Sequence, residues 1–194
     1  MVIKINPQKL DGNWRAGWAL DLHTLQSSLL QDGRFDTQRT EIGELLYQLK
    51  YRNDKSKIKP IAEAAANFLK TRWILKSLAA IIPVPPSIER DFQPVEELAK
   101  EIGKRVNLPV ALDYLLKTRV TKPLKTLEDT LSRRKELEDA FSVKDDRFVD
   151  KRVLLFDDLI RSGETLSAIT NILMVKGKIE RVYVLTITKT RTLR

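Results

Sequence analysis

The stretch VLLFDDLIRSGETLSAI, residues 153 to 169, joins an apolar run, an acidic pair and a glycine-containing turn in one continuous segment. The run from Val153 to Phe156 is typical of a strand buried on both faces, and it leads directly into Asp157 and Asp158. A helix is predicted from Ser162 to Lys176. A buried strand that passes through a tight turn into a helix is the repeating unit of a parallel α/β sheet.

The segments around this stretch continue the same alternation. Apolar runs at residues 79–84 (AAIIPV) and 181–187 (RVYVLTI) predict two more buried strands, and residues 108–116 predict another. Helical spacing of apolar residues follows Thr40 as N-cap, continues over residues 56–77, and starts again at Pro94. We therefore expect an α/β fold with a mainly parallel central sheet and helices on both faces. Residues 1–39 form an irregular or β-rich hood, and residues 40–194 form the core.

Composition excludes several kinds of site. The chain has 194 residues and no cysteine, so it has no disulfide, no thiolate zinc site and no cysteine nucleophile. Its single histidine, His23, makes a Ser-His-Asp hydrolase improbable and is expected to be an ordinary residue of an N-terminal strand. Neither a membrane-spanning apolar run nor a secretory signal is found, so a cytoplasmic protein is expected. The net charge of +9 indicates either an anionic partner or lysines that serve solubility alone.

The residues after the central strand have the chemistry of a phosphate and sugar site. Ligands bind at the carboxyl ends of the strands in open parallel sheets, and a helix N-terminus attracts phosphate. Gly163 allows close approach of the backbone, and the hydroxyls of Ser162 and Thr165 can donate hydrogen bonds. Asp157 and Asp158 would repel a phosphate, so their expected partners are sugar hydroxyls and a divalent cation.

VLLFDDLIRSGET resembles the motif of type I phosphoribosyltransferases that binds phosphoribosyl pyrophosphate (PRPP). The resemblance implies that Asp157 and Asp158 bind the ribose hydroxyls and hold Mg²⁺, directly or through water. It also implies a cradle for the 5-phosphate formed by Arg161, Ser162, Gly163, Glu164 and Thr165. The alternative from the residues alone is an acidic pair before an ordinary capped helix.

Three further segments are similar to ComF-type members of that family: IIPVPPSIERDFQPVEELA from Ile81, TRVTKPLKTLEDTLSRRKELEDAF from Thr118, and LKYRNDKSKIKPIAE from Leu49. The likeness covers about residues 40 to 190. Arg90 and Phe92 match the pattern, whereas Asp91 and Gln93 stand where Gly and Asn are usual. Lys125 and Glu136 likewise replace a common Gln and Asn. The cysteine-rich zinc segment of many ComF-type proteins is missing, and without cysteine the chain cannot perform glutamine-dependent transfer alone.

The resemblance also implies where pyrophosphate would bind. The residues in question follow the strand at Ile81 and comprise Pro85, Pro86, Ser87 and Arg90. A basic segment would fold over the ligand as a flexible loop, with the cations Arg119, Lys122, Lys125 and Arg133. A solvated face is the alternative for these cations. Arg161 stands where purine-salvage relatives carry an acidic base, so it either pairs with an anionic acceptor or phosphate or is a solvated loop residue.

Three functions remain open at this level. In the first, the chain transfers phosphoribose from PRPP to an unidentified small acceptor with Mg²⁺. In the second, it binds PRPP as a non-catalytic sensor. In the third, its resemblance to competence-associated ComF proteins implies that it handles single-stranded DNA, which the tryptophans Trp14, Trp18 and Trp73 allow. Trp73 is expected in the core because of its helical spacing. A homodimer is the usual expectation for the family.

Overall fold

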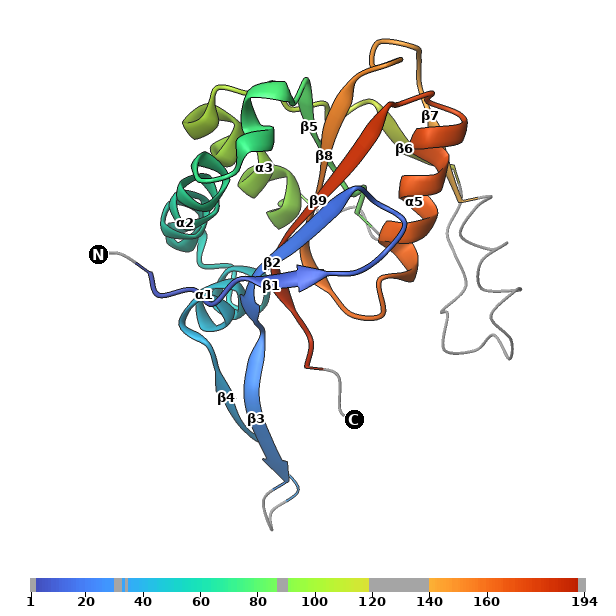
Figure 1. Ribbon diagram of the computed structural model, residues 1–194. Helices are drawn as coiled ribbons and strands as arrows, with labels where there is room; N and C mark the ends of the chain where they lie inside the picture. The colour runs from blue at the N-terminus through green and yellow to red at the C-terminus, as the bar shows by residue number, and fades with distance from the viewer. Residues whose placement is uncertain (1–2, 30–32, 34, 87–90, 119–139, 192–194) are drawn as a thin grey trace.

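The computed structural model describes residues 3–29, 33, 35–86, 91–118 and 140–191 (Figure 1). Its first elements are the strands β1 (Gln8–Leu10), β2 (Ala16–Leu22), β3 (Thr24–Leu29) and β4 (Phe35–Arg39). They are followed by α1 (Glu41–Tyr51), the 3₁₀ turn η1 (Lys55–Lys57), α2 (Ile58–Lys70), the 3₁₀ turn η2 (Trp73–Ser77), β5 (Ala80–Pro83) and α3 (Pro94–Val106). The remaining elements are β6 (Leu115–Lys117), β7 (Phe141–Val143), β8 (Arg152–Ile160), α5 (Glu164–Val175) and β9 (Arg181–Lys189).

A five-stranded sheet in the order β1-β2-β9-β8-β5 forms the centre of the molecule. Strands β2, β9, β8 and β5 are parallel, and only β1 runs antiparallel to its neighbour. The apolar runs predicted as buried strands at β5, β8 and β9 lie side by side, with β9 and β8 inside the sheet and β5 at its edge. The expected mainly parallel α/β sheet is confirmed.

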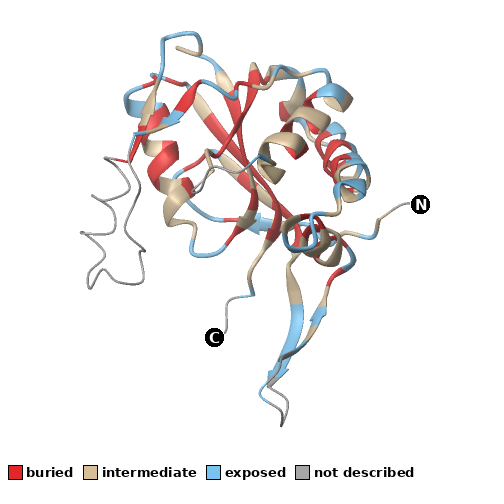
Figure 2. Ribbon diagram, turned by 180° about the vertical axis from the view of Figure 1, so that it is seen from behind, coloured by how far each residue is buried: buried red, intermediate tan, exposed pale blue. Residues whose placement is uncertain are grey.

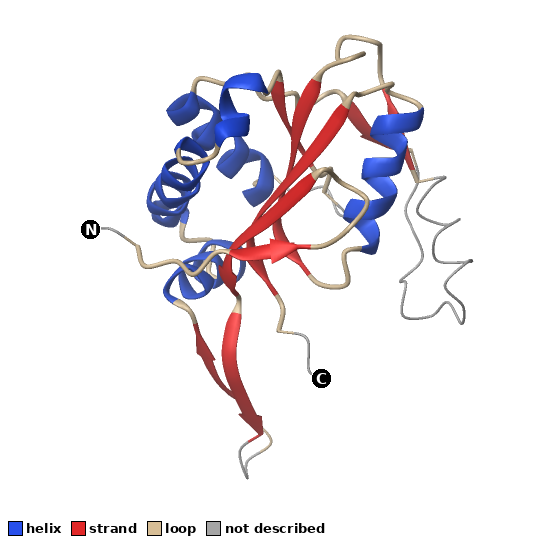
Figure 3. Ribbon diagram, viewed as in Figure 1, coloured by secondary structure: helices blue, strands red, loops and turns tan. Residues whose placement is uncertain are grey.

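Helices cover both faces of this sheet, as predicted (Figure 3). Alternation along β8 divides the core in two, because successive side chains of a strand point to opposite faces. Val153 and Leu155 pack with α5 and with the β6–β7 pair, whereas Leu154 and Phe156 pack with α1, α2 and α3. Figure 2 shows the buried residues concentrated along the central strands and on the inward sides of the helices. Burial on both faces explains why these strands read as continuous apolar runs.

The N-terminal segment differs from the expected hood. Residues 8–22 form β1 and β2 of the central sheet, with β2 parallel to β9, and only the β3–β4 hairpin projects from the body (Figure 1). Ala19 packs in the core on the α5 side and Leu20 in the core on the α1 side. Strand β2 is therefore covered on both faces, which is why it belongs to the sheet and not to a separate cover.

Two other elements also differ from the sequence prediction. The helix expected over residues 56–77 ends at Lys70, where the hydroxyl of Thr71 donates to the carbonyl of Phe68, and Trp73 starts a separate 3₁₀ turn. Trp73 is 72% exposed, so its expected place in the core is wrong. The strand expected at residues 108–116 is reduced to a single bridge between Ile81 and Val110 and to the short β6.

Thr40 fixes the junction between the hairpin and α1, as its sequence position predicts. Its hydroxyl oxygen accepts from the Gly43 N–H at 3.0 Å and its hydroxyl donates to the Leu22 carbonyl at 2.6 Å. Replacing Thr40 by Ala should lower the free energy of unfolding by about 1–2 kcal/mol, because both bonds are lost in a buried place. Urea denaturation measures this. Thr40→Ser keeps the hydroxyl and should retain most of the stability; an equal loss in both variants would contradict the assignment.

Candidate functional site

The acidic pair lies within the last part of β8, at the carboxyl end of the parallel strands. Asp157 pairs in register with Thr186 of β9, and the preceding Phe156 pairs with Pro83 of β5. The Val84 N–H donates to the Phe156 carbonyl at 2.8 Å, so the chain leaves β5 directly beside the acids. Pro85 and Pro86 follow this bond and are half-buried. The predicted ribose site and the start of the predicted pyrophosphate loop are therefore neighbours.

Asp158 forms an ion pair that the sequence analysis did not identify. The Lys50 ammonium, from the last turn of α1, lies 2.8 Å from Oδ2 and 3.0 Å from Oδ1 of Asp158. Asp158 is only 5% exposed, and burial of a carboxylate is costly without a charged partner. Lys50 is thus a residue of the candidate site. The sequence signal that could have identified Lys50 is its position in the LKYRND segment, which resembles a ComF-type segment.

Asp157 occupies the opposite face of the strand from Asp158. Alternation places it on the α5 side with Val153 and Leu155, and its Oδ1 accepts from the Asp158 N–H at 2.8 Å. Loss of water around this half-buried carboxylate, together with the negative charge of Asp158, raises the pKa of Asp157 to about 8. The Asp158 N–H and the charge of Lys50 oppose that rise. The two adjacent acids therefore differ: Asp158 is ion-paired with a lysine, whereas the pKa of Asp157 is raised.

His23 lies beside this pair, between β2 and β3. Its Nδ1 is 3.2 Å from the Thr188 hydroxyl, which donates to the Asp158 carbonyl at 3.5 Å, so the Thr188 oxygen can accept from His23. Burial lowers the pKa of His23, and the nearby positive charges of Arg39, Lys50 and Arg161 lower it further, against the opposing charge of Asp158. His23 is thus more than the ordinary strand residue expected, because it is a neutral imidazole in a cationic environment beside the acids.

The turn after β8 opens onto the N-terminus of α5. Gly163 has φ of +82°, a conformation that other residues rarely adopt, and it is the N-cap of the helix. Because it is a glycine, this N-cap offers no side chain to cap the helix. The Ser162 hydroxyl donates to Glu164 at 3.1 Å and lies 3.5 Å from the Glu164 N–H. Arg161 and Ser162 are exposed, whereas Glu164 and Thr165 are half-buried.

The structure brings together only part of the predicted site. Asp157, Asp158, the Arg161–Thr165 turn, Pro85 and Pro86 lie at one end of the sheet. The other predicted residues fall outside the described residues: Ser87, Arg90, Arg119, Lys122, Lys125 and Arg133. Within the described residues, no group of three or more His, Asp or Glu side chains is placed to hold a metal ion.

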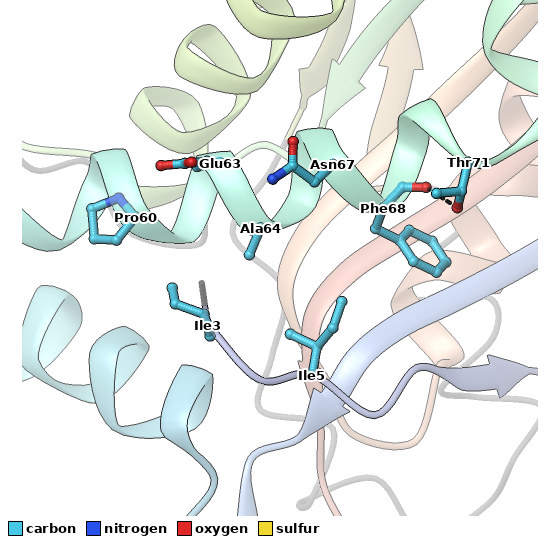
Figure 4. A pocket seen from close by; sticks show the side chains of 8 residues that line it. All are labelled: Ile3, Ile5, Pro60, Glu63, Ala64, Asn67, Phe68 and Thr71. Atoms are coloured by element: carbon cyan, nitrogen blue, oxygen red, sulfur yellow. Dashed lines mark hydrogen bonds between the residues drawn. The ribbon is translucent and has the colours of Figure 1, made fainter. Parts of the chain in front are cut away.

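The apolar groove in Figure 4 lies away from the acidic pair. It has a volume of about 270 Å³ and runs between the N-terminal residues and α2. Its lining consists of Ile3, Ile5, Pro60, Glu63, Ala64, Asn67, Phe68 and Thr71. None of these is a predicted site residue. In addition, no helix in the described ranges is both long and apolar enough to cross a membrane.

Comparisons with known proteins give structural likenesses only. No protein-family model matches the chain, and no curated protein matches it. Orotate phosphoribosyltransferase from Aeropyrum pernix is 18% identical with a TM-score of 0.47, over 86% of this chain and 76% of that one. Adenine phosphoribosyltransferase from Trypanosoma brucei is 16% identical with a TM-score of 0.48, over 79% and 59%. The Leishmania tarentolae adenine enzyme is 10% identical with a TM-score of 0.43, over 93% and 94%.

The raised pKa of Asp157 predicts how stability depends on pH. Between the ordinary value of 3.8 and about 8, the folded chain holds a proton that the unfolded chain has released, so stability falls as pH rises through this window. Asp157→Asn removes that loss and keeps an oxygen for the Asp158 N–H. The Tm of this variant relative to wild type should therefore rise from pH 5 to pH 8, by about 3 °C for each kcal/mol recovered.

Asp145→Asn is the matched control in the same thermal melts. Hydrogen bonds from Arg147 lower the pKa of Asp145, so this exposed carboxylate contributes stability at high pH that is lost as pH falls. That loss lies below the ordinary pKa of 3.8, so Asp145→Asn should lower Tm by an amount that stays constant between pH 5 and pH 8. A Tm difference for Asp157→Asn that stays constant with pH, or falls as pH rises, would show that Asp157 titrates normally.

Proposed function

We propose that the chain binds PRPP with Mg²⁺ at the carboxyl end of the sheet and transfers its phosphoribosyl group to a small acceptor. The observation that carries the proposal is the arrangement of β8 and α5. Two unlike carboxylates end the strand, and a glycine with φ of +82° then leads to a helix N-terminus. Few ligands other than a phosphorylated sugar need an anion site and hydroxyl acceptors in direct succession.

In this proposal the turn after β8 binds the 5-phosphate. The N–H groups of the first turn of α5 and the helix dipole attract an anion, and the positive φ of Gly163 allows the tight turn that leads into this helix. The exposed Arg161 adds a positive charge. The Ser162 hydroxyl would exchange its bond to Glu164 for one to phosphate. All of these groups already lie in one turn, so little reorganisation is required.

The two carboxylates accept hydrogen bonds from the ribose hydroxyls. Asp158 would do so from its ion pair with Lys50, and Asp157, whose pKa is raised by burial, would do so from the opposite face of β8. Departure of pyrophosphate leaves positive charge on the ribose in the transition state. Negative carboxylates fixed beside that ring stabilise the charge without having to reorganise. Neither acid has to form a covalent bond to the sugar.

Magnesium fits this site only as an ion shared with the ligand. Asp157 and Asp158 are the hard oxygen ligands that Mg²⁺ prefers, but no group of three or more His, Asp or Glu side chains among the described residues is placed to hold the ion. The polyphosphate would have to supply most of the remaining ligands. When bound, the ion would neutralise charge on the leaving pyrophosphate. The chain's own part is to hold the sugar at the acids and the phosphate at α5.

Isothermal titration calorimetry with PRPP, with and without Mg²⁺, tests the proposal. Wild type should bind in a magnesium-dependent manner, and the Asp157→Asn/Asp158→Asn variant should lose about tenfold or more in affinity, because the ribose hydroxyls would then donate to neutral amide oxygens in place of carboxylates. Asp157→Asn alone retains the Lys50 ion pair and guards against loss of folding. Asp145→Asn/Asp146→Asn is the control, because it removes the same charge from an exposed acidic pair.

A pyrophosphate-release assay with candidate acceptors separates the remaining functions. Release in the presence of an acceptor identifies a transferase, whereas magnesium-dependent binding with no release for any acceptor identifies a PRPP sensor. Absence of binding heat at millimolar PRPP by the folded wild type, or equal affinity in the double variant and its control, would overturn the site.

A further inference from the structure

Two glycines in the connection between β1 and β2 hold Trp14 in place. The stretch GNWRAG, residues 12–17, puts Gly12 before the indole and Gly17 after it. A Cβ at Gly12 would overlap the six-membered ring of Trp14, and a Cβ at Gly17 would overlap its Nε1. The buried indole also donates from Nε1 to the Leu10 carbonyl at 3.0 Å. Both glycines are therefore needed to let the backbone pack against this ring.

The same indole lies beside the turn that follows β8. A Cβ at Gly163 would lie 3.8 Å from Cη2 of Trp14 and 3.4 Å from Cδ1 of Ile160, so these two side chains flank one face of Gly163. Trp14 and Ile160 share a buried hydrophobic cluster with Leu166, in the first turn of α5. The six-membered ring of Trp14 is thus part of the apolar surface on which the start of α5 rests.

A hydrogen bond joins the β1–β2 connection to the same helix. Asn13 Nδ2 donates to the Ser167 carbonyl at 2.9 Å, and the Ser167 N–H donates to the Gly163 carbonyl at 2.9 Å. The connection is also held to the central sheet, because the Arg15 N–H donates to the Val182 carbonyl of β9 at 2.8 Å. An N-terminal segment that is anchored on the sheet therefore reaches the start of α5 (Figure 1).

We propose that Trp14 and Asn13 are positioning residues of the Arg161–Thr165 turn. This inference rests on the proposed function, in which that turn binds the 5-phosphate. Backbone N–H groups bind a phosphate well only when they point at one place, and a displacement of about 1 Å can cost up to about a hundredfold in activity. Glycine has more backbone freedom than any other residue, so a turn that contains Gly163 needs support from outside itself. Trp14 and Asn13 supply this support without touching the ligand.

The alternative is that Trp14 only fills the core. Two ligands separate these roles, because ribose 5-phosphate carries the phosphate that the turn would bind, whereas pyrophosphate is expected at the loop after β5. A displaced turn weakens the binding of ribose 5-phosphate alone. A general loss of stability has no reason to distinguish the two ligands.

Isothermal titration calorimetry on the whole chain tests the proposal. Trp14→Phe removes the part of the ring that reaches Gly163 and should weaken ribose 5-phosphate binding about tenfold. Its affinity for pyrophosphate with Mg²⁺, measured with the turn saturated by ribose 5-phosphate, should be unchanged. Asn13→Ala removes one hydrogen bond from an exposed residue and should weaken ribose 5-phosphate binding about threefold, with the wild-type Tm retained.

Trp18→Phe is the matched control. It makes the same substitution in β2, at a ring that packs against Phe68 of α2 on the other face of the sheet, at 6.0 Å between ring centroids. Both tryptophan variants should have a lower Tm than wild type, because each loses part of a packed indole. Only Trp14→Phe should lose affinity for ribose 5-phosphate.

Three results would each show that Trp14 only fills the core: wild-type affinity in Trp14→Phe, equal losses in the two tryptophan variants, or equal losses for the two ligands. If Trp14→Phe does not fold, Asn13→Ala decides, and an unchanged affinity for ribose 5-phosphate in that variant overturns the proposal. A folded wild type that binds neither ribose 5-phosphate nor PRPP would overturn the proposed function as well, which distinguishes the two failures.

Discussion

The ion pair between Lys50 and Asp158 joins the end of α1 to the end of β8, at an Asp158 side chain almost fully withdrawn from water. A carboxylate in that position is costly unless a cation reaches it, so α1 must be held where its last turn meets the sheet. Thr40 fixes the start of the same helix to the carbonyl of Leu22, at the end of β2. These two contacts, one at each end of α1, hold the base of the β3–β4 hairpin beside the acidic pair. His23 lies at that base.

The neighbouring acids acquire different properties from this arrangement. Asp158 points toward α1 and is neutralised by Lys50, whereas Asp157 points toward α5, has no such partner in the described residues, and has a raised pKa. One ion-paired carboxylate and one carboxylate with a raised pKa thus stand directly before a helix N-terminus. At the amino end of the sheet, where β8 and β9 begin, Arg152 and Arg181 are paired with Glu180.

Much of this could be predicted from the sequence where the signals are local. The apolar run at Val153, the acidic pair and Gly163 predict strand, turn and helix, because burial on both faces and a positive φ leave few alternatives. Parallel pairing of β2 with β9 is not local: AGWALDL contains no turn or period that identifies a partner more than 150 residues away. Lys50 and Asp158 are separated by 108 positions, so their ion pair could not be predicted from the sequence either. Trp73 was misplaced because helical spacing continued past Thr71, where a side-chain hydrogen bond ends the helix.

Amide chemical shifts of the isotope-labelled 22.3 kDa chain, recorded during titration with PRPP and Mg²⁺, test most directly whether the turn between β8 and α5 is the ligand site. The account predicts the largest shifts at Asp158, at Gly163 to Thr165 and at Val84, with Trp73 and Lys76 unchanged. Shifts confined to the groove along α2 or to the amino end of the sheet, or none at saturating ligand, would contradict it.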